Sequence, residues 1–296
     1  MNTLILKLNA SGDVVRTTPL LRRLHGRVTW VTAERNLPLL ERTAEHLRCL
    51  AWERREEATD SRYDLVINLE DESEIAEFAR TVKHDRIFGA FHDHGGRLTY
   101  TDNARGWFDL SLISRFGRAR ADELKLRNRR AYQELIFEGL GLEFRGEPYL
   151  LPPPIATDLK GDVAIASAAG PVWPMKTWVY YEKLGLALEA TGLRVNVLPQ
   201  RRSMLEHLGD IDGHRCVVGG DSLPMHLALG LGKTCVTIFN CTSPWEIYDY
   251  GLLTKLVSPV LSEFFYKRDF DPRATTAVSV DEVVHAVMSC LERIPA

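Results

Sequence analysis

The sequence lacks the cysteine patterns that would indicate a redox or metal site. It has five cysteines, and they include no CxxC pair and no spacing typical of metal ligands. Their odd number also argues against the disulfide framework that stabilises many small secreted domains. We therefore expect reduced thiols that pack inside a cytoplasmic protein.

Long apolar runs and an excess of either charge are also missing. No stretch reaches the roughly 18 consecutive apolar residues of a membrane-spanning helix, and the apolar run at the start is too short for a signal peptide. Lysine and arginine total 37 against 40 aspartate and glutamate, which gives a net charge of -3. We therefore expect no nucleic-acid partner, and membrane contact that is peripheral at most.

The length and the apolar content suffice for two domains of moderate size. The chain has 296 residues, of which 45% are apolar, and prolines cluster at Pro148 and at residues 152–154. Such a cluster interrupts helices and strands, so we place a linker there. The prediction is an N-terminal domain of residues 1–154 and a C-terminal domain of residues 155–296.

Strand-like and helix-like patterns alternate in both halves. Short apolar runs predict strands at residues 4–8, 28–32, 63–69, 163–167, 193–198, 216–218 and 234–239. Apolar residues at helical spacing predict helices at residues 14–24, 115–142, 180–190, from about 224, and at 280–293. This alternation is typical of α/β domains with parallel sheets.

The first candidate site is the turn after the first predicted strand, where Ser11, Gly12 and Asp13 lead into a helix. Ligands of α/β domains usually bind at this edge of the sheet, so Asp13 is a candidate catalytic group. The alternative is structural, with Ser11 capping the helix and Asp13 complementing its dipole. Only one glycine is present, so the dinucleotide fingerprint is missing and a nicotinamide enzyme is not expected.

The second candidate site follows the predicted strand at 216–218. Its glycine-rich end leads into a helix that begins near Pro224, and free backbone N–H groups at a helix start favour a diphosphate. Asp221, Ser222 and His226 offer hydrogen bonds to a sugar or to phosphates. The alternative is that Asp221 only caps the helix and that His226 belongs to the core.

Two further segments carry polar groups that suit an anionic ligand. Lys176, between two tryptophans, follows the strand at 163–167 and is able to neutralise charge on a departing diphosphate. Thr242 and Ser243 follow the strand at 234–239 and are able to line the same ligand site as Lys176. The alternatives are a solvated lysine and an ordinary Ser-Pro turn.

Three segments together resemble a known family, glycosyltransferase family 9, which includes the bacterial ADP-heptose heptosyltransferases. They are KLNASGDVVRTTPLLRRL, WPMKTW and VVGGDSLPMHLALGLGKTCVTIFNCTSPWEIYDYG, and they occur in the family's order across both predicted domains. The resemblance implies the GT-B fold, in which two Rossmann-like domains with parallel sheets face a central cleft. The first domain would hold the acceptor and the second the nucleotide sugar.

The resemblance also assigns roles to residues in an inverting reaction that needs no metal or other cofactor. Asp13 becomes the general base, next to Gly12, with Asp71 and Asp109 as reserve bases. The donor pocket, which would hold ADP-heptose, takes the matching residues Lys176, Asp221, Ser222, Met225, His226, Thr242 and Ser243. The acceptor would be a hydroxyl of a glycolipid core, as in lipopolysaccharide biosynthesis, of a protein, or of a metabolite.

The sequence departs from the family pattern at two positions of the donor pocket. Leu223 and Asn240 stand where the family commonly has glycine, and the cysteine cluster of some metal-binding relatives is missing from residues 261–268. We therefore expect no structural metal. The departures leave two alternatives open: a protein that binds a nucleotide sugar without transferring it, and a GT-B transferase that uses a UDP or GDP sugar.

Overall fold

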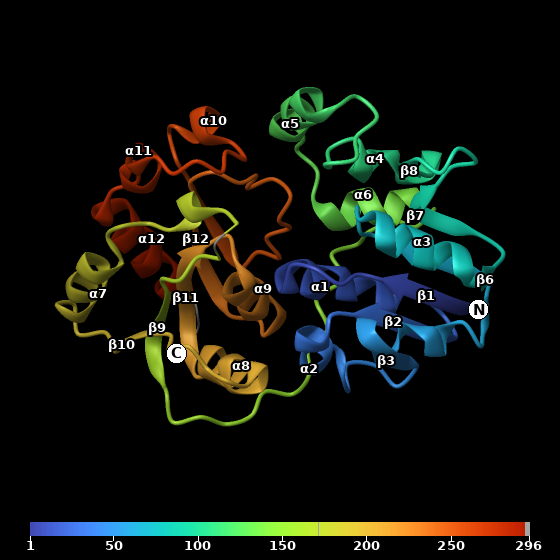
Figure 1. The fold of residues 1–296 in the computed structure, drawn as a ribbon. Helices are drawn as coiled ribbons and strands as arrows, with labels where there is room; N and C mark the ends of the chain where they lie inside the picture. Colours follow the sequence, from blue (N-terminus) through green and yellow to red (C-terminus); the bar gives the residue numbers. More distant parts are fainter. Residues whose placement is uncertain (171, 294–296) are drawn as a thin grey trace. The chain divides into compact units, whose positions relative to one another are not determined.

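The computed structural model describes residues 1–170 and 172–293. The chain divides into two compact units, Met1–Pro152 and Pro153–Ala296, so the division falls inside the proline run where the linker was expected. Each unit is built around its own sheet (Figure 1).

The first unit contains a six-stranded sheet with the order β3-β2-β1-β5-β7-β8. Neighbouring strands are parallel except β8, which runs antiparallel to β7 at the edge. The strands are β1 (Asn2–Leu6), β2 (Arg27–Thr32), β3 (Leu47–Ala51), β5 (Leu65–Asn68), β7 (Ile87–His92) and β8 (Leu98–Tyr100). A separate parallel pair is formed by β4 (Arg62–Tyr63) and β6 (Lys83–His84).

Both faces of this sheet are buried, as expected for parallel strands covered by helices. Leu4 and Leu6 of β1 pack in a cluster with α3 (Ser73–Thr81). Ile5, between them, belongs to the cluster on the other face with α1 (Ser11–Thr17) and α6 (Tyr132–Gly139). The remaining short elements are η1 (Thr18–Arg22), η2 (Glu34–Asn36), α2 (Leu37–Leu40), η3 (Trp52–Ala58), η4 (Asp102–Ala104) and α4 (Arg105–Phe108), where η denotes a 3-10 helix.

The prediction of one helix over residues 115–142 was wrong. The structure has two helices there, α5 (Arg118–Arg127) and α6 (Tyr132–Gly139). The backbone turns to an extended conformation at Asn128, whose side chain accepts a hydrogen bond from the Arg130 amide and donates one to its carbonyl. An asparagine that bonds to nearby backbone in this way competes with the helix, which explains the break.

The second unit contains a five-stranded sheet with the order β10-β9-β11-β12-β13, and all its neighbouring strands are parallel. The strands are β9 (Gly161–Ala166), β10 (Val195–Val197), β11 (His214–Gly220), β12 (Thr234–Phe239) and β13 (Leu253–Val257). One face is covered by α7 (Tyr181–Glu189) and α12 (Val280–Glu292), and the other by α8 (Met204–Asp212) and α9 (Leu223–Gly230) (Figure 1). The shorter elements are η5 (Pro174–Lys176), α10 (Leu261–Phe264) and α11 (Pro272–Thr276).

The last helix, α12, begins at a capping box that its sequence encodes. The Ser279 hydroxyl accepts a hydrogen bond from the Glu282 amide, and the Glu282 carboxylate accepts one from the Ser279 amide. The helix packs against β11, β12, β13 and α7 of its own unit. The expected α/β class with parallel sheets is confirmed in both units.

No helix within the described residues is long and apolar enough to cross a membrane.

Candidate functional site

In each sheet the strand order reverses at one point. The reversal lies between β1 and β5 in the first sheet and between β9 and β11 in the second. Loops that leave two such strands at their carboxyl ends run to opposite faces, and the crevice between the loops is where α/β sheets bind ligands. Asp13 lies in the first turn of α1, which follows β1, and Asp71 lies in the loop after β5. Lys176 ends η5, between β9 and α7, and Asp221 directly follows β11.

The turn between β1 and α1 is strained. Ala10 has a φ of 56°, a left-handed conformation that residues with a side chain rarely adopt. The Ala10 carbonyl accepts a hydrogen bond of 2.7 Å from the Asp13 amide, which fixes the first turn of α1. Such strain is retained where the surrounding structure requires one backbone path, and here the path places Gly12 and Asp13 at the edge of the sheet.

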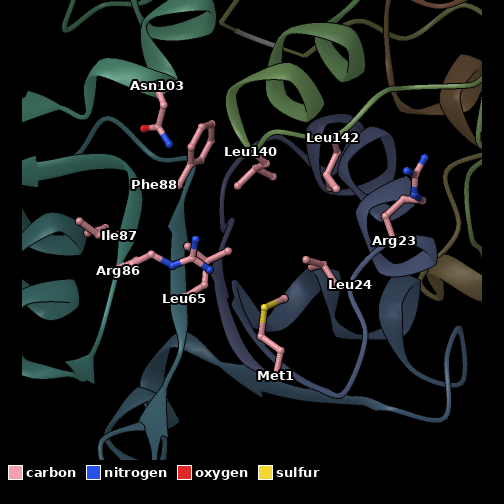
Figure 2. Close-up of a pocket in the computed structure, with 10 residues that line it drawn as sticks. All are labelled: Met1, Arg23, Leu24, Leu65, Arg86, Ile87, Phe88, Asn103, Leu140 and Leu142. Carbon is pink, nitrogen blue, oxygen red and sulfur yellow. The ribbon is translucent and has the colours of Figure 1, made fainter.

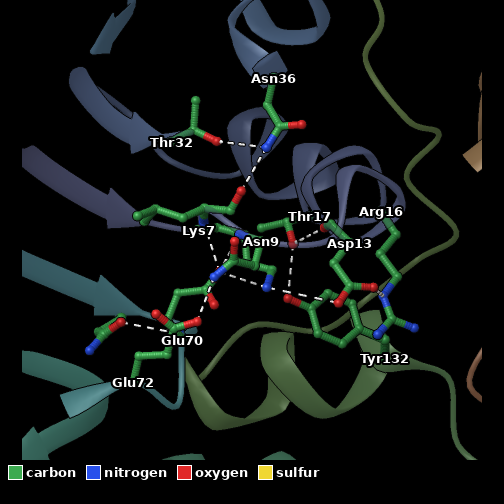
Figure 3. Close-up of polar contacts among 12 residues, drawn as sticks. Lys7, Asn9, Asp13, Arg16, Thr17, Thr32, Asn36, Glu70, Glu72 and Tyr132 are labelled. Carbon is green, nitrogen blue, oxygen red and sulfur yellow. Dashed lines mark hydrogen bonds and ion pairs between the residues drawn. The ribbon is translucent and has the colours of Figure 1, made fainter. Parts of the chain in front are cut away.

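The Asp13 carboxylate faces two cations (Figure 3). Oδ1 lies 3.0 Å from Arg16 Nε, and Oδ2 lies 3.8 Å from Lys7 Nζ. The Arg16 guanidinium in turn stacks on the ring of Tyr132, 4.2 Å from its centroid. The Asp13 side chain keeps 32% of its surface exposed, so a ligand is able to reach it.

Glu70, which the sequence analysis did not single out, holds this arrangement together. Its Oε1 accepts hydrogen bonds from Lys7 Nζ at 2.8 Å, from the Leu8 amide at 2.7 Å and from the Asn9 amide at 3.0 Å (Figure 3). The carboxylate thus ties the exit of β1 to the exit of β5. A lysine inside the apolar run of the first strand was the signal for a buried acidic partner.

Burial alone would lower the pKa of Lys7, but the Glu70 and Asp13 carboxylates outweigh it, and the pKa is raised. Lys7 is therefore a stable buried cation next to Asp13.

The two reserve carboxylates lie in different surroundings. Asp71 is half-buried next to Glu70, and burial together with the Glu70 charge raises its pKa. Asp109 accepts a short hydrogen bond from the Tyr100 hydroxyl and pairs with Arg115 Nε at 3.3 Å, which joins the end of α4 to β8. Asp71 thus shares the charged cluster around Lys7, whereas Asp109 belongs to a separate network.

In the second unit the structure brings Lys176 and Asp221 together. Lys176 Nζ lies 3.2 Å from Asp221 Oδ2, and the two side chains are 21% and 13% exposed. The close approach of their loops needs Gly220, because a Cβ atom there would lie only 2.5 Å from the Lys176 carbonyl oxygen.

The other donor residues surround the start of α9 and the end of β12. Ser222 immediately precedes α9 and donates a hydrogen bond to the Gly220 carbonyl, while Met225 and His226 lie buried within the helix. Thr242 and Ser243 are buried after β12. The intervening residue, Cys241, has its pKa raised to about 12 by burial, against the opposing charge of nearby Lys176, so this loop lies beside the Lys176–Asp221 pair.

Three buried side-chain oxygens of this last loop have no hydrogen-bond partner among the residues that the structure describes. They are Asn240 Oδ1, Thr242 Oγ1 and Ser243 Oγ. Buried polar atoms are nearly always satisfied in native proteins, so such a group indicates a place for water or ligand atoms.

A cavity of about 450 Å³ lies elsewhere, at the amino-terminal edge of the first sheet (Figure 2). It is lined mainly by apolar side chains, with two arginines, Arg23 and Arg86. None of the sequence-predicted site residues lines it.

The described parts of the chain, 1–170 and 172–293, contain no group of three or more His, Cys, Asp or Glu side chains placed to hold a metal ion.

The fold matches solved glycosyltransferases over nearly the whole chain. A family 9 glycosyltransferase from Veillonella parvula is 16% identical with a TM-score of 0.70, and the match covers 99% of this chain and 98% of that one. The E. coli heptosyltransferase WaaC, solved with ADP, is 18% identical with a TM-score of 0.62, and the match covers 98% and 100%. The chain has the GT-B fold.

A third GT-B structure, the iron-containing dodecameric glycosyltransferase TibC from enterotoxigenic E. coli, is 12% identical with a TM-score of 0.61, covering 99% of this chain and 78% of that one. No protein-family model matches the sequence, and no curated protein matches it. The prediction of a GT-B fold is confirmed, and the likeness at these identities concerns the fold.

Proposed function

We propose that this chain is an inverting glycosyltransferase of family 9 that transfers heptose from ADP-heptose to a hydroxyl acceptor. The observation that carries the proposal is that charged side chains lie at the point of reversed strand order in each of the two sheets of a GT-B fold. One has a partly exposed carboxylate, Asp13, and the other has the cation Lys176 beside the start of α9. The solved complex of WaaC with ADP supports an adenine nucleotide as the donor.

The proposed reaction is a single displacement at the anomeric carbon. The acceptor oxygen attacks this carbon while its proton passes to the Asp13 carboxylate. The bond from the anomeric carbon to the diphosphate oxygen breaks, its electron pair stays on ADP, and the configuration inverts. Arg16 and Lys7 stabilise the ionised carboxylate, which is the form that accepts the proton.

The charge that develops on the departing diphosphate needs cationic or dipolar partners. Lys176 is one, and the positive end of the α9 dipole, at the start of that helix, is the other. Thr242 Oγ1 and Ser243 Oγ are buried hydroxyl oxygens with no hydrogen-bond partner among the described residues, which supports their place in the donor pocket. We propose that these groups act without a metal ion, so transfer should be unchanged in EDTA.

Calorimetric titration with ADP, UDP and GDP tests the donor first. We expect ADP to bind most tightly, and Lys176→Ala to weaken its binding. Tighter binding of UDP or GDP would instead indicate a GT-B transferase with another donor.

ADP release from ADP-heptose then tests catalysis. Asp13→Asn should abolish release and leave ADP binding intact. Asp64→Asn is the matched control, because Asp64 accepts a hydrogen bond from the Asn2 amide at the opposite edge of the same sheet. Donor binding without release or transfer in the wild-type protein would favour a nucleotide-sugar-binding protein.

A further inference from the structure

Asn240 connects two loops of the proposed donor site. It follows β12 directly and is 1% exposed. Its Nδ2 donates a hydrogen bond of 2.8 Å to the carbonyl oxygen of Thr177, 63 positions earlier in the chain. Thr177 is the residue after Lys176, so this bond holds the peptide next to the cation that faces Asp221.

The flanks of the Lys176 loop are held in a different way. Met175 is buried in a cluster with Cys241 and Phe264, and the Trp178 indole donates to the Val278 carbonyl at 2.9 Å. These contacts fix the two sides of the loop, one by packing and the other by a side-chain hydrogen bond. The orientation of the Thr177 carbonyl, between them, is set by the hydrogen bond from Asn240.

We propose that Asn240 is a positioning residue for Lys176 and thereby sets the affinity of the site for a diphosphate. The inference rests on the proposed function, in which Lys176 binds the donor diphosphate. A glycine at residue 240 has no side chain to form this bond. The asparagine that stands here in place of the family's glycine therefore anchors the Lys176 loop through its side chain. It is not a defect of the pocket.

The physical reason is the geometry that a charged hydrogen bond requires. An ammonium–phosphate hydrogen bond is strong only near 2.7–2.9 Å, so small displacements of the lysine backbone weaken it. In the proposed donor site Lys176 binds only the diphosphate, so binding of the rest of the nucleotide should be insensitive to the same displacement. Asn240 therefore distinguishes ligands by their terminal phosphate.

The test compares ADP with AMP, which lacks the terminal phosphate, by calorimetry. Asn240→Leu keeps the number and branching of the side-chain heavy atoms and removes the donor, and it should weaken ADP binding roughly fivefold, the effect of one net hydrogen bond. AMP binding should change less than about twofold. In a Lys176→Ala background, Asn240→Leu should have no further effect on ADP binding.

Asn196→Leu is the matched control within the same unit. Its Nδ2 also donates to a backbone carbonyl, that of Lys160, at 3.1 Å, but at the amino-terminal edge of the sheet. This variant should leave the ratio of ADP to AMP affinity unchanged. If Asn240→Leu does not fold, Asn240→Gly removes the same bond without adding bulk.

Hydrogen exchange of the protein without nucleotide tests the anchoring of the loop itself. Amides of residues 175–178 should exchange faster in Asn240→Leu than in the wild type, and amides of β11 should not. Unchanged exchange at 175–178, or an equal loss of ADP and AMP affinity, would overturn the inference. If the wild-type protein binds no ADP, the proposed donor is wrong, and so is the role of Asn240 in diphosphate binding. The exchange experiment still decides whether the Asn240 hydrogen bond anchors the loop.

Discussion

Replacing Glu70 with alanine should destabilise the protein by about 3–5 kcal/mol, the usual cost of removing one partner of a buried ion pair. Three donors lose their acceptor, namely Lys7 Nζ and the amides of Leu8 and Asn9. The Lys7 side chain is only 7% exposed, so its charge is left largely unsolvated. Asp13, 3.8 Å away, still opposes part of that charge.

The cost of the unpaired charge has an upper limit, because Lys7 is able to lose its proton. Neutralising a lysine at pH 7, from an ordinary pKa of 10.5, costs about 5 kcal/mol. Glu70→Gln should lose less, about 1.5–3 kcal/mol, because its amide oxygen still accepts from the two backbone amides. Lys7→Met combined with Glu70→Gln should be more stable than Glu70→Gln alone, since the buried lysine charge without its partner is then removed.

Urea unfolding of the four proteins at pH 7 measures these differences from the transition midpoints. The pH dependence gives a second check. Because the pKa of Lys7 is raised on folding, its contribution is complete below pH 10.5 and is lost as the pH rises through the folded value. A loss below about 1 kcal/mol for Glu70→Ala, or a double variant no more stable than Glu70→Gln, would refute the reasoning.

Three other predictions concern separate parts of the molecule. Burial alone would raise the pKa of Asp210, but two hydrogen bonds from Arg201, of 2.6 and 2.8 Å, outweigh it and lower the pKa. The stabilisation is therefore present above pH 3.8 and lost as the pH falls through the folded value, so Arg201→Met should reduce the difference in unfolding free energy between pH 7 and pH 3. Burial raises the pKa of the Cys241 thiol to about 12, so iodoacetamide at pH 8 should label it only after denaturation, as mass spectrometry would show; rapid labelling of the folded protein would contradict this. Ala10→Gly should raise the unfolding free energy by about 0.5–1 kcal/mol by relieving the left-handed backbone, whereas Ala33→Gly, at a φ of -66°, should lower it in the same thermal denaturation assay.

Local patterns were sufficient to predict the strands that are apolar along their whole length. The expected strand at 234–239 coincides with β12 (Thr234–Phe239), whose residues are nearly all buried. The sequence analysis missed β13 (Leu253–Val257), because Thr254 and Lys255 interrupt its apolar run and the strand lies at the edge of the sheet. The first strand was expected to continue to Leu8, but β1 ends at Leu6 and the Leu8 amide bonds to the Glu70 carboxylate instead.

In the candidate site, too, the sequence predicted residues with a recognisable local pattern and missed contacts between distant segments. Asp13, Lys176 and Asp221 were found because each follows a recognisable strand, and strand ends in α/β sheets converge on one edge. The long-range hydrogen bonds that hold their loops in place were not predicted. Glu70 and Asn240 act through hydrogen bonds to segments more than sixty positions away. No periodicity or motif near either residue encodes such a bond.

The central place of β1 has a consequence for how the first unit folds as the chain is synthesised. Thr3 pairs with Val28 on one side and with Leu65 on the other, so β1 leaves the ribosome before both neighbouring strands and gains the second one much later. Until then one edge of an apolar strand is exposed and able to pair with another chain. Expression at low temperature, which weakens apolar association between chains, should therefore raise the soluble yield, and fusion partners that keep nascent chains apart should have the same effect.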